Sequence, residues 1–411
     1  MLDELESLAL KLWKRVGCGK FLFFVGVDFR IGPDGKPYMI DFNRSPGGLT
    51  KNPDKTLAYE LLAKMVVNRL GRGIKIGLLY SPDSRELTRE APRGERFNKQ
   101  LMREIKERML KVEGVEDVQF MFSPFRKKLG SNLKIEGNML KRVNPEYTPD
   151  AIIRFTIKRR KFLDFVDQPV FNPQWICLGG FDKAALEEAY TKLESELGFA
   201  RGELIVRPKT YLVENVENLK AIVEMHPVAV KPVDSWWSRK VAIIKTPEET
   251  ERELERAGLK LKKGKPVLVQ EYIYSSPPWV ETGFLAAGKG GKRKVKSKLF
   301  YQWDLRITLI SVNQEELPVS TGGNIRIAPK PYRYELLEEA SNVRFSPGLR
   351  NAYIASRIGM KYRVLDEETS RLLGLTKDLM REAALRASIA WVAFEKYIRD
   401  LAGASISLES L

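Results

Sequence analysis

The sequence predicts a mixed fold of the α/β and α+β classes, divided into two or three domains. With 411 residues, the chain is too long for one ordinary hydrophobic core. Residues 73–122 alternate between strand, helix and strand patterns, as expected of a parallel α/β domain. Residues 204–275 instead combine short strand patterns with two helix patterns, which indicates a compact α+β unit.

The predicted elements begin with a helix over residues 2–17, where apolar side chains recur at helical spacing until Gly17 and Gly19. A β-hairpin follows at 21–43 and a second helix at 54–70, after which we expect a domain boundary near residue 72. The same patterns predict these further elements: helices at 97–112, 181–198, 247–257 and 366–402, and strands at 73–80, 116–122, 151–157, 204–213, 227–233, 240–245, 266–273 and 299–312.

Composition excludes several functional classes. No apolar run approaches the roughly eighteen residues that cross a bilayer, and the acidic, amphipathic start is unlike a signal peptide, so we expect a soluble, cytoplasmic protein with no membrane partner. The only cysteines, Cys18 and Cys177, exclude a disulfide scaffold and a multi-cysteine zinc site. His226 is the sole histidine, so any bound metal must rely on oxygen ligands, which favours Mg²⁺ or Mn²⁺.

The charge balance indicates anionic partners. Lysine and arginine exceed aspartate and glutamate to give a net charge of +17. A strongly positive surface attracts anions such as a nucleotide, a nucleic acid or an acidic carrier.

The hairpin has a strong turn signal at residues 33–36, because their Asp-Gly centre tolerates positive φ angles. Centring the turn there pairs Val27 with Phe42 and Phe29 with Ile40 on one face of the hairpin. These apolar pairs predict that this face is buried.

On the other face, the same register places Asp28 opposite Asp41, with Asn43 two residues further along. Two carboxylates directly opposite each other repel, so a cation between them would explain the pair. The alternatives are that both carboxylates point to water, or that the register differs by one residue and separates them.

This hairpin resembles the metal-binding hairpin of the ATP-grasp superfamily, in which an acidic residue is followed by an acid-x-Asn motif and a Pro-Gly turn. Here these positions are Asp28, then Asp41 to Asn43, then the turn at 45–48. The family usually has glutamate at the position of Asp41. The resemblance implies that Asp28, Asp41 and Asn43 bind Mg²⁺ or Mn²⁺ together with ATP.

The resemblance extends downstream. Lys183 in GGFDKAALEE and Lys231 in VAVKP match the family lysines, which implies contacts with ATP phosphates. VQEYI resembles the family hinge, which implies that Gln270 and the backbone of residues 271–273 hold the adenine edge. The implied hinge residues are Gln270, Glu271, Tyr272 and Ile273. Singly, each position has a simpler explanation, such as a strand-end surface lysine for Lys231.

Two further residues take roles from the same resemblance. Arg306 in WDLRITLI is expected to contact the γ-phosphate or an acyl phosphate, which makes Arg306 and Lys231 the catalytic candidates. Glu281 is a weaker candidate for the ribose hydroxyls. The alternative for the arginine is an exposed ion pair with Asp304.

The loop after Lys231 departs from the family because residues 233–240 contain no glycine. Ser235 and Arg239 are expected to donate to phosphate in place of backbone N–H groups. The alternative is that the adjacent tryptophan pair packs the loop down and leaves its basic residues solvated.

The order of these motifs implies a circular permutation of the ATP-grasp fold, in which a parallel α/β domain usually comes first. We expect residues 1–71 to form the metal hairpin part of the C-terminal lobe, 72–180 the parallel domain, 181–275 the lysine and hinge lobe, and 276–411 the remainder of the C-terminal lobe with a helical end. A permuted chain keeps its site, since binding depends on where groups converge. The alternative is an intertwined homodimer.

The implied function is that of an ATP- and Mg²⁺-dependent ligase that activates a carboxylate as an acyl phosphate for attack by an amine or thiol. The alternatives are a phosphotransferase on the same scaffold and a basic nucleotide- or RNA-binding protein without turnover. Basic segments at 289–298 and 158–161 favour an anionic small molecule, an acidic peptide or carrier, or RNA as partner, unless they are solvated loops.

Overall fold

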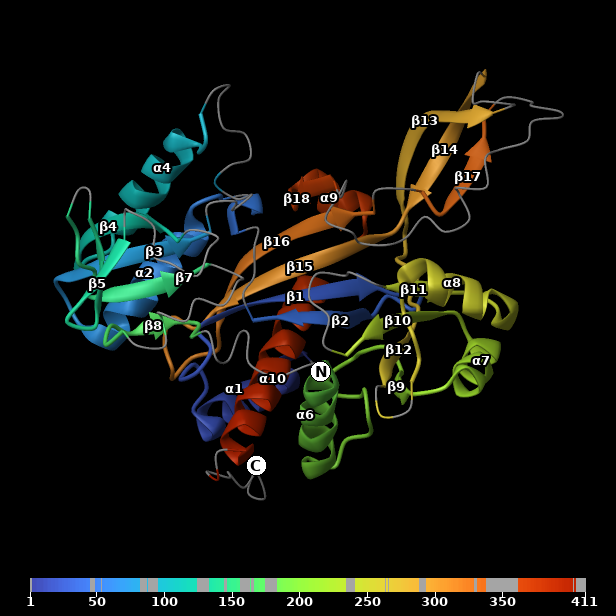
Figure 1. The fold of residues 1–411 in the computed structure, drawn as a ribbon, viewed down its shortest axis with the longest axis horizontal. Helices are drawn as coiled ribbons and strands as arrows, with labels where there is room; N and C mark the ends of the chain where they lie inside the picture. Colours follow the sequence, from blue (N-terminus) through green and yellow to red (C-terminus); the bar gives the residue numbers. More distant parts are fainter. Residues whose placement is uncertain are drawn as a thin grey trace.

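A computed structural model describes residues 2–44, 49–52, 54–81, 87, 95–123, 133–143, 146–155, 163, 166–173, 183–233, 241–262, 264, 266–287, 293–328, 331–337, 361–401 and 403. It contains both parallel and antiparallel sheets (Figure 1), which confirms the mixed α/β and α+β class. None of the described helices is long and apolar enough to span a bilayer.

The central element is an antiparallel sheet of five strands in the order β18-β16-β15-β1-β2. It joins the two ends of the chain, because β1 pairs with β15 as well as with β2. The strand bounds are β1 Phe24–Ile31, β2 Pro37–Asn43, β15 Trp303–Ile310, β16 Val319–Ile327 and β18 Lys361–Val364.

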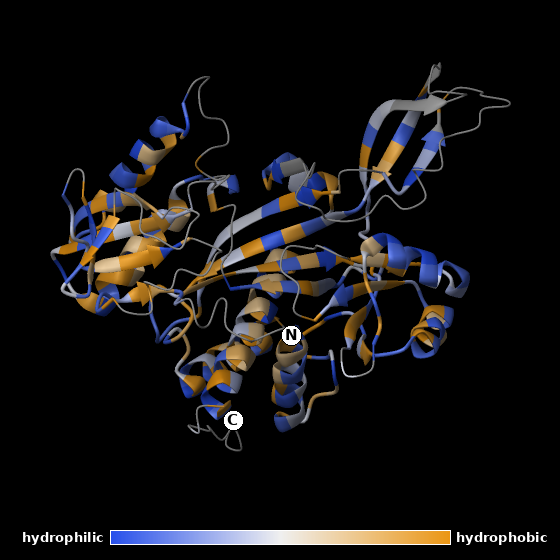
Figure 2. Ribbon diagram, viewed as in Figure 1, coloured by the Kyte–Doolittle hydropathy of each residue, from blue (hydrophilic) through white to orange (hydrophobic). Residues whose placement is uncertain are grey.

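One face of this sheet is apolar and is covered by helices. These helices are α1 Leu2–Val16, α6 Lys183–Glu196 and α10 Lys377–Leu401. Val27, Leu305 and Ile307 from the sheet are fully buried against them. Trp13 of α1 and Trp391 of α10 meet edge to face, with ring centroids 5.1 Å apart. Because strand side chains alternate, the opposite face carries the polar residues, and bands of both colours alternate along these strands in Figure 2.

A parallel sheet in the order β4-β3-β7-β8 lies beside α2 Leu57–Leu70 and α4 Lys99–Leu110. Its strands are β3 Ile74–Tyr80, β4 Val115–Phe122, β7 Ala151–Arg154 and β8 Val170–Phe171. A two-stranded ladder of β5 Leu133–Glu136 and β6 Met139–Arg142 adjoins it. Asn172, which follows β8, accepts hydrogen bonds from the backbone N–H groups of Phe23 and Phe24, and so ties this sheet to β1.

The third unit is an antiparallel sheet in the order β11-β10-β12-β9, packed against α7 Val216–Met225 and α8 Thr250–Ala257. Its strands are β9 Thr210–Val213, β10 Val228–Pro232, β11 Ala242–Ile244 and β12 Val267–Glu271. A further sheet in the order β13-β14-β17 extends away from the body in Figure 1. Its strands are β13 Trp279–Ala287, β14 Arg293–Tyr301 and β17 Arg333–Leu336.

The predicted hairpin register is correct at the aspartates and wrong nearer the turn. Asp28 pairs with Asp41 as expected, but Phe29 pairs with Met39 rather than Ile40, because a bulge lies between Asp28 and Phe29. The bulge accommodates Ile40 as an extra residue, so that both Met39 and Phe42 reach the apolar core.

Three other expected elements differ from the structure. The strand expected at 204–213 is short, since only β9 pairs with a neighbour. The strand expected at 299–312 is divided at Gln302 between two sheets, with β14 in one and β15 in the other. The helix expected at 366–402 is divided into α9 Glu367–Leu372 and α10, because Gly374 adopts a φ of 64°.

Candidate active site on the polar face of the central sheet

The polar face carries a row of four side chains across four strands. The register places Asn324 of β16 beside Arg306 of β15, Arg306 beside Asp28 of β1, and Asp28 beside Asp41 of β2. Each of these residues has at least one apolar neighbour in sequence that lies in the opposite core, so the sheet pleat itself produces the row. The predicted convergence of Asp28 with Arg306 therefore comes from direct strand pairing.

Asp28 is almost fully buried, with 1% of its surface exposed, and it is surrounded by cations. Arg306 donates to both carboxylate oxygens, at 2.6 and 2.8 Å. Arg326 of β16 forms an ion pair with Oδ2 at 2.7 Å, and Asn43 Nδ2 donates to the same oxygen at 3.1 Å. Two arginines thus supply the positive charge that offsets the repulsion between Asp28 and Asp41.

A second buried carboxylate lies on the same face. Asp304 accepts hydrogen bonds from Arg30 of β1 through Nε at 3.0 Å and from Arg326 at 3.3 Å. Asp304 is 2% exposed, so the alternative of an exposed ion pair between Asp304 and Arg306 does not hold. Arg326 bridges Asp28 and Asp304, which links the two carboxylates into one network.

The two predicted lysines approach this face from other elements. Lys183, at the start of α6, lies 3.5 Å from Asp41 Oδ1. Lys231 of β10 donates to Gln270 Oε1 at 2.6 Å. Burial and the neighbouring Lys183 lower the pKa of Lys231 to about 7, although the charge of Asp41 acts in the opposite direction. Burial opposes ionisation of Asp41 as well, but Lys183, Lys231 and the arginines outweigh it and lower its pKa.

The described part of this face therefore gathers more positive than negative groups. The positive side chains are Arg30, Lys183, Lys231, Arg306 and Arg326, and the carboxylates are Asp28, Asp41 and Asp304. Such an excess of partly desolvated cations provides a binding environment for a polyanion.

The expected hinge comprises the last two residues of β12 and the two residues that follow it. The backbone N–H groups of Glu271 and Tyr272 donate to Lys209 O and Pro227 O, and Ile273 O accepts from Arg30. These three groups already have partners, so an adenine edge would have to use other groups of this segment.

Other predicted site residues lie elsewhere. Glu281 lies on β13, in a different sheet, where it accepts a hydrogen bond from Trp279 Nε1. Ser235 and Arg239, the turn at 45–48, Cys177, the segment 158–161 and the tip at 289–292 lie outside the described residues.

The donor set of the hairpin suits a hard divalent cation. Asp28, Asp41 and Asn43 carry carboxylate and amide oxygens, the ligand types that Mg²⁺ and Mn²⁺ prefer, although both oxygens of Asp28 already accept hydrogen bonds from Arg306. Among the described residues, no group of three or more His, Cys, Asp or Glu side chains is placed to hold a metal. A metal here would therefore depend on Asn43 as well as on the two aspartates.

Sequence reasoning missed Arg30, Asp304, Asn324 and Arg326. Arg30 follows Asp28 by two residues and Asp304 precedes Arg306 by two, so strand periodicity already places each on the face of its predicted neighbour. The two β16 residues had no such signal, because their position depends on the pairing of β16 with β15.

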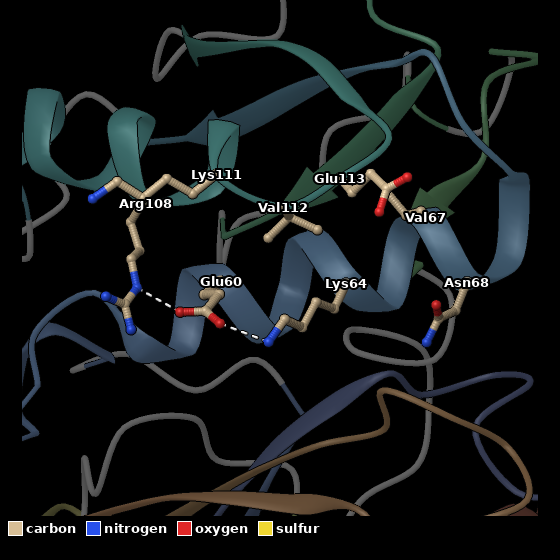
Figure 3. Close-up of a pocket in the computed structure, with 8 residues that line it drawn as sticks. All are labelled: Glu60, Lys64, Val67, Asn68, Arg108, Lys111, Val112 and Glu113. Atoms are coloured by element: carbon tan, nitrogen blue, oxygen red, sulfur yellow. Dashed lines mark ion pairs between the residues drawn. The ribbon is translucent and has the colours of Figure 1, made fainter.

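A surface pocket of about 550 Å³ lies apart from this face, between α2 and α4. Figure 3 shows that Glu60, at its centre, pairs with Lys64 at 2.6 Å and with Arg108 at 2.5 Å. The pocket is lined only by residues of these helices and the turn after α4, so it does not belong to the candidate active site.

The chain shares its fold with a known structure, "Putative gamma-glutamylcysteine synthetase" from Methylobacillus flagellatus. The match has a TM-score of 0.56 and 13% identity and covers 97% of each chain. Two further matches are too weak to show a shared fold. D-alanyl-alanine synthetase A from Vibrio cholerae has a TM-score of 0.29 at 14% identity and covers 55% of this chain and 66% of that one. A RimK domain ATP-grasp protein from Sphaerobacter thermophilus has a TM-score of 0.31 at 12% identity, covering 75% and 98%. No family model and no curated protein matches the sequence.

Proposed function

We propose that this chain, whose fold is the ATP-grasp fold, is an ATP- and Mg²⁺-dependent ligase that activates a carboxylate as an acyl phosphate. The observation that carries the proposal is the row of Asp41, Asp28 and Arg306 on the polar face, with Lys183 and Lys231 facing it. A triphosphate supplies the negative charge that this group of cations lacks.

Lys183 and Lys231 would neutralise the phosphates, while Gln270, Tyr272 and the adjoining backbone would lie near the base. Asp28, Asp41 and Asn43 would hold Mg²⁺ or Mn²⁺, which neutralises charge on the β- and γ-phosphates when it is bound.

Arg306 would stabilise the transferring phosphoryl group from a position that Asp28 fixes. A guanidinium held by two hydrogen bonds to a buried carboxylate loses little freedom when the charge of the transition state develops. The acceptor carboxylate oxygen attacks the γ-phosphorus, and the bond to the bridging oxygen breaks to release ADP. An amine or thiol then attacks the acyl carbon, loses its proton and displaces phosphate.

The name of the structural match supplies the first acceptor pair to test, L-glutamate with L-cysteine. ADP release that requires an acceptor separates an enzyme from a basic binding protein. Phosphate release that requires the amine or thiol separates a ligase from a phosphotransferase. Salt-sensitive RNA binding that is independent of ATP would support the binding protein instead.

The central test replaces Asp41 or Asp28 by asparagine and measures Mg²⁺-dependent ADP binding by calorimetry. We expect Asp41→Asn to weaken this binding about 10- to 100-fold, because interactions of charged groups contribute about 1.5–3 kcal/mol. Asp28→Asn should weaken it similarly and also lower the melting temperature, since it leaves two arginines without their carboxylate. Asp34→Asn, at the exposed tip of the same hairpin, is the matched control. Unchanged binding in both Asp41→Asn and Asp28→Asn would disprove the metal role.

A further inference from the structure

The neutral end of the polar face contains a buried amide whose hydrogen-bonding capacity is unused. Asn324 is 1% exposed, and within the described part of the chain neither its Oδ1 nor its Nδ2 has a hydrogen-bond partner. Buried amides in folded proteins nearly always have partners, because an unpaired buried polar group is costly. Asn324 therefore lacks a partner that the described part of the chain could provide, and a bound ligand would supply one.

The position of Asn324 connects it to the proposed reaction. It lies one strand beyond Arg306 in the row that contains Asp28 and Asp41. The lysines approach the opposite end of this row, next to Asp41. The row therefore runs from a cationic end to an uncharged end.

A second buried amide lies at the uncharged end. Asn52 is 1% exposed and donates to Thr321 Oγ1 at 2.7 Å, three residues before Asn324. Its Oδ1 has no hydrogen-bond partner among the described residues. The two asparagines, one within β16 and one bonded to it at Thr321, thus leave one donor group and two acceptors without a described partner.

We propose that Asn324, assisted by Asn52, binds the acceptor substrate of the ligase, and that this acceptor is a carboxylic acid that also carries an ammonium or hydroxyl group. This inference rests on the proposed function. The acid accepts from Asn324 Nδ2, and its ammonium or hydroxyl group donates to Asn324 Oδ1 and Asn52 Oδ1. Arg306, in the next strand, faces the carboxylate that receives the phosphoryl group.

The chemistry of the two ends separates this ligand from the nucleotide. Phosphate oxygens only accept hydrogen bonds, so they pair with the lysines and arginines and leave the asparagine acceptors unused. A site that hydrogen-bonds a polar group of its substrate discriminates strongly against an analogue that lacks this group. We therefore expect simple monocarboxylates such as acetate and propionate to be poor acceptors.

The test replaces Asn324 by leucine, whose side chain has the same branching and no polar atoms. We expect the melting temperature without ligands to stay the same or rise, because an unpaired buried amide is removed. Mg²⁺-dependent ADP affinity should change by less than about twofold, whereas the KM for L-glutamate should rise at least about tenfold. The matched control is Gln168→Leu, which removes a buried amide bonded to Leu140 and Pro149 and should lower the melting temperature.

A melting temperature that falls as far in Asn324→Leu as in Gln168→Leu would show that Asn324 is structural and overturn the inference. Binding is measured separately, as thermal shifts caused by amino acids, hydroxy acids and monocarboxylates in the presence of Mg²⁺ and ADP. We expect a shift from at least one amino or hydroxy acid in the wild type that is lost in Asn324→Leu. No such shift would overturn the inference even if ADP still binds, whereas loss of Mg²⁺-dependent ADP binding itself would overturn the proposed function.

Discussion

At the scale of single residues, the polar face shows that each buried carboxylate is stabilised by nearby cations. Asp28 and Asp41 lie side by side, yet each has its own cations: Arg306 and Arg326 for Asp28, and Lys183 for Asp41. Removing one partner of such a buried ion pair destabilises the fold, because the remaining charge stays buried without compensation. Burial, together with the neighbouring positive charge of Lys183, lowers the pKa of Lys231 to about 7.

The lowered pKa of Lys231 predicts proton uptake on nucleotide binding. At pH 8 this lysine is mostly neutral in the folded protein, whereas in the unfolded chain it stays protonated up to its ordinary pKa of 10.5. Its contribution to stability therefore rises as the pH increases from about 7 towards 10.5, because the unfolded chain binds more protons there. A phosphate beside Lys231 favours its charged form. ADP binding at pH 8 should therefore be accompanied by proton uptake, and ADP binding at pH 6 should not.

Calorimetry of ADP binding in Hepes and Tris, which differ in ionisation enthalpy, measures this uptake. We expect Lys231→Met to abolish the uptake at pH 8 and Lys36→Met, on the exposed hairpin turn, to preserve it. Equal uptake in wild type and Lys231→Met would assign the proton to another group.

At the scale of elements, the hairpin and helix α10 position the row. The bulge at Ile40 lets Met39 and Phe42 both reach the core while Asp41 stays on the polar face. Glu395 of α10 attaches the chain ahead of β1 to the helix layer, because its Oε1 accepts hydrogen bonds from the backbone N–H groups of Gly19 and Leu22.

Removal of this acceptor should destabilise the protein. Glu395→Ala leaves the N–H groups of Gly19 and Leu22 and the indole N–H of Trp391 without their buried partner, at a cost of about 2–3 kcal/mol. Glu395→Gln keeps an accepting oxygen and should recover most of this loss. Thermal and urea unfolding measure both, with Glu188→Ala on the exposed side of α6 as control. Equal losses in alanine and glutamine variants would mean that the charge, not the acceptor, matters.

At the scale of the whole molecule, the central sheet closes within one chain. Strand β1 pairs with β15, and α1 packs against α10 through Trp13 and Trp391. Asp41 from the beginning of the chain and Lys231 from its middle then face the same site. The described strands thus complete the sheet without a second subunit, unlike in an intertwined homodimer. The division into domains at residues 71, 180 and 275 stays a prediction.

Because the central sheet forms within one chain, we expect that two binding-deficient variants do not complement each other. Asp41→Asn and Lys231→Met chains, unfolded and refolded together, should bind no more ADP than each does separately, since every site takes both residues from one chain. An intertwined dimer would regain one intact site in mixed dimers. Calorimetric stoichiometry of the mixture measures the difference, and wild type refolded in the same way is the control.

The sequence by itself determined the local features: strand and helix patterns, the Asp-Gly hairpin and the pairing of Asp28 with Asp41. These depend on short-range periodicity and turn geometry, which neighbouring residues specify. The family resemblance added Lys183, Lys231 and Arg306, and the structure brings all three to the predicted face. Their catalytic and binding roles remain predictions.

Only the tertiary structure decided which charges are compensated and which polar groups are not. The bridge from Arg326 to Asp28 depends on the pairing of β1 with β15, which lie far apart in sequence. The bulge at Ile40 and the position of Asn324, which has no hydrogen-bond partner among the described residues, depend on the register within two hairpins. A period-two pattern gives the face of each strand but not its neighbour, its register or the burial of its end. For that reason the sequence indicated the end of the row near Lys183 and Lys231, and Asn324 was recognised only when β16 was placed beside β15.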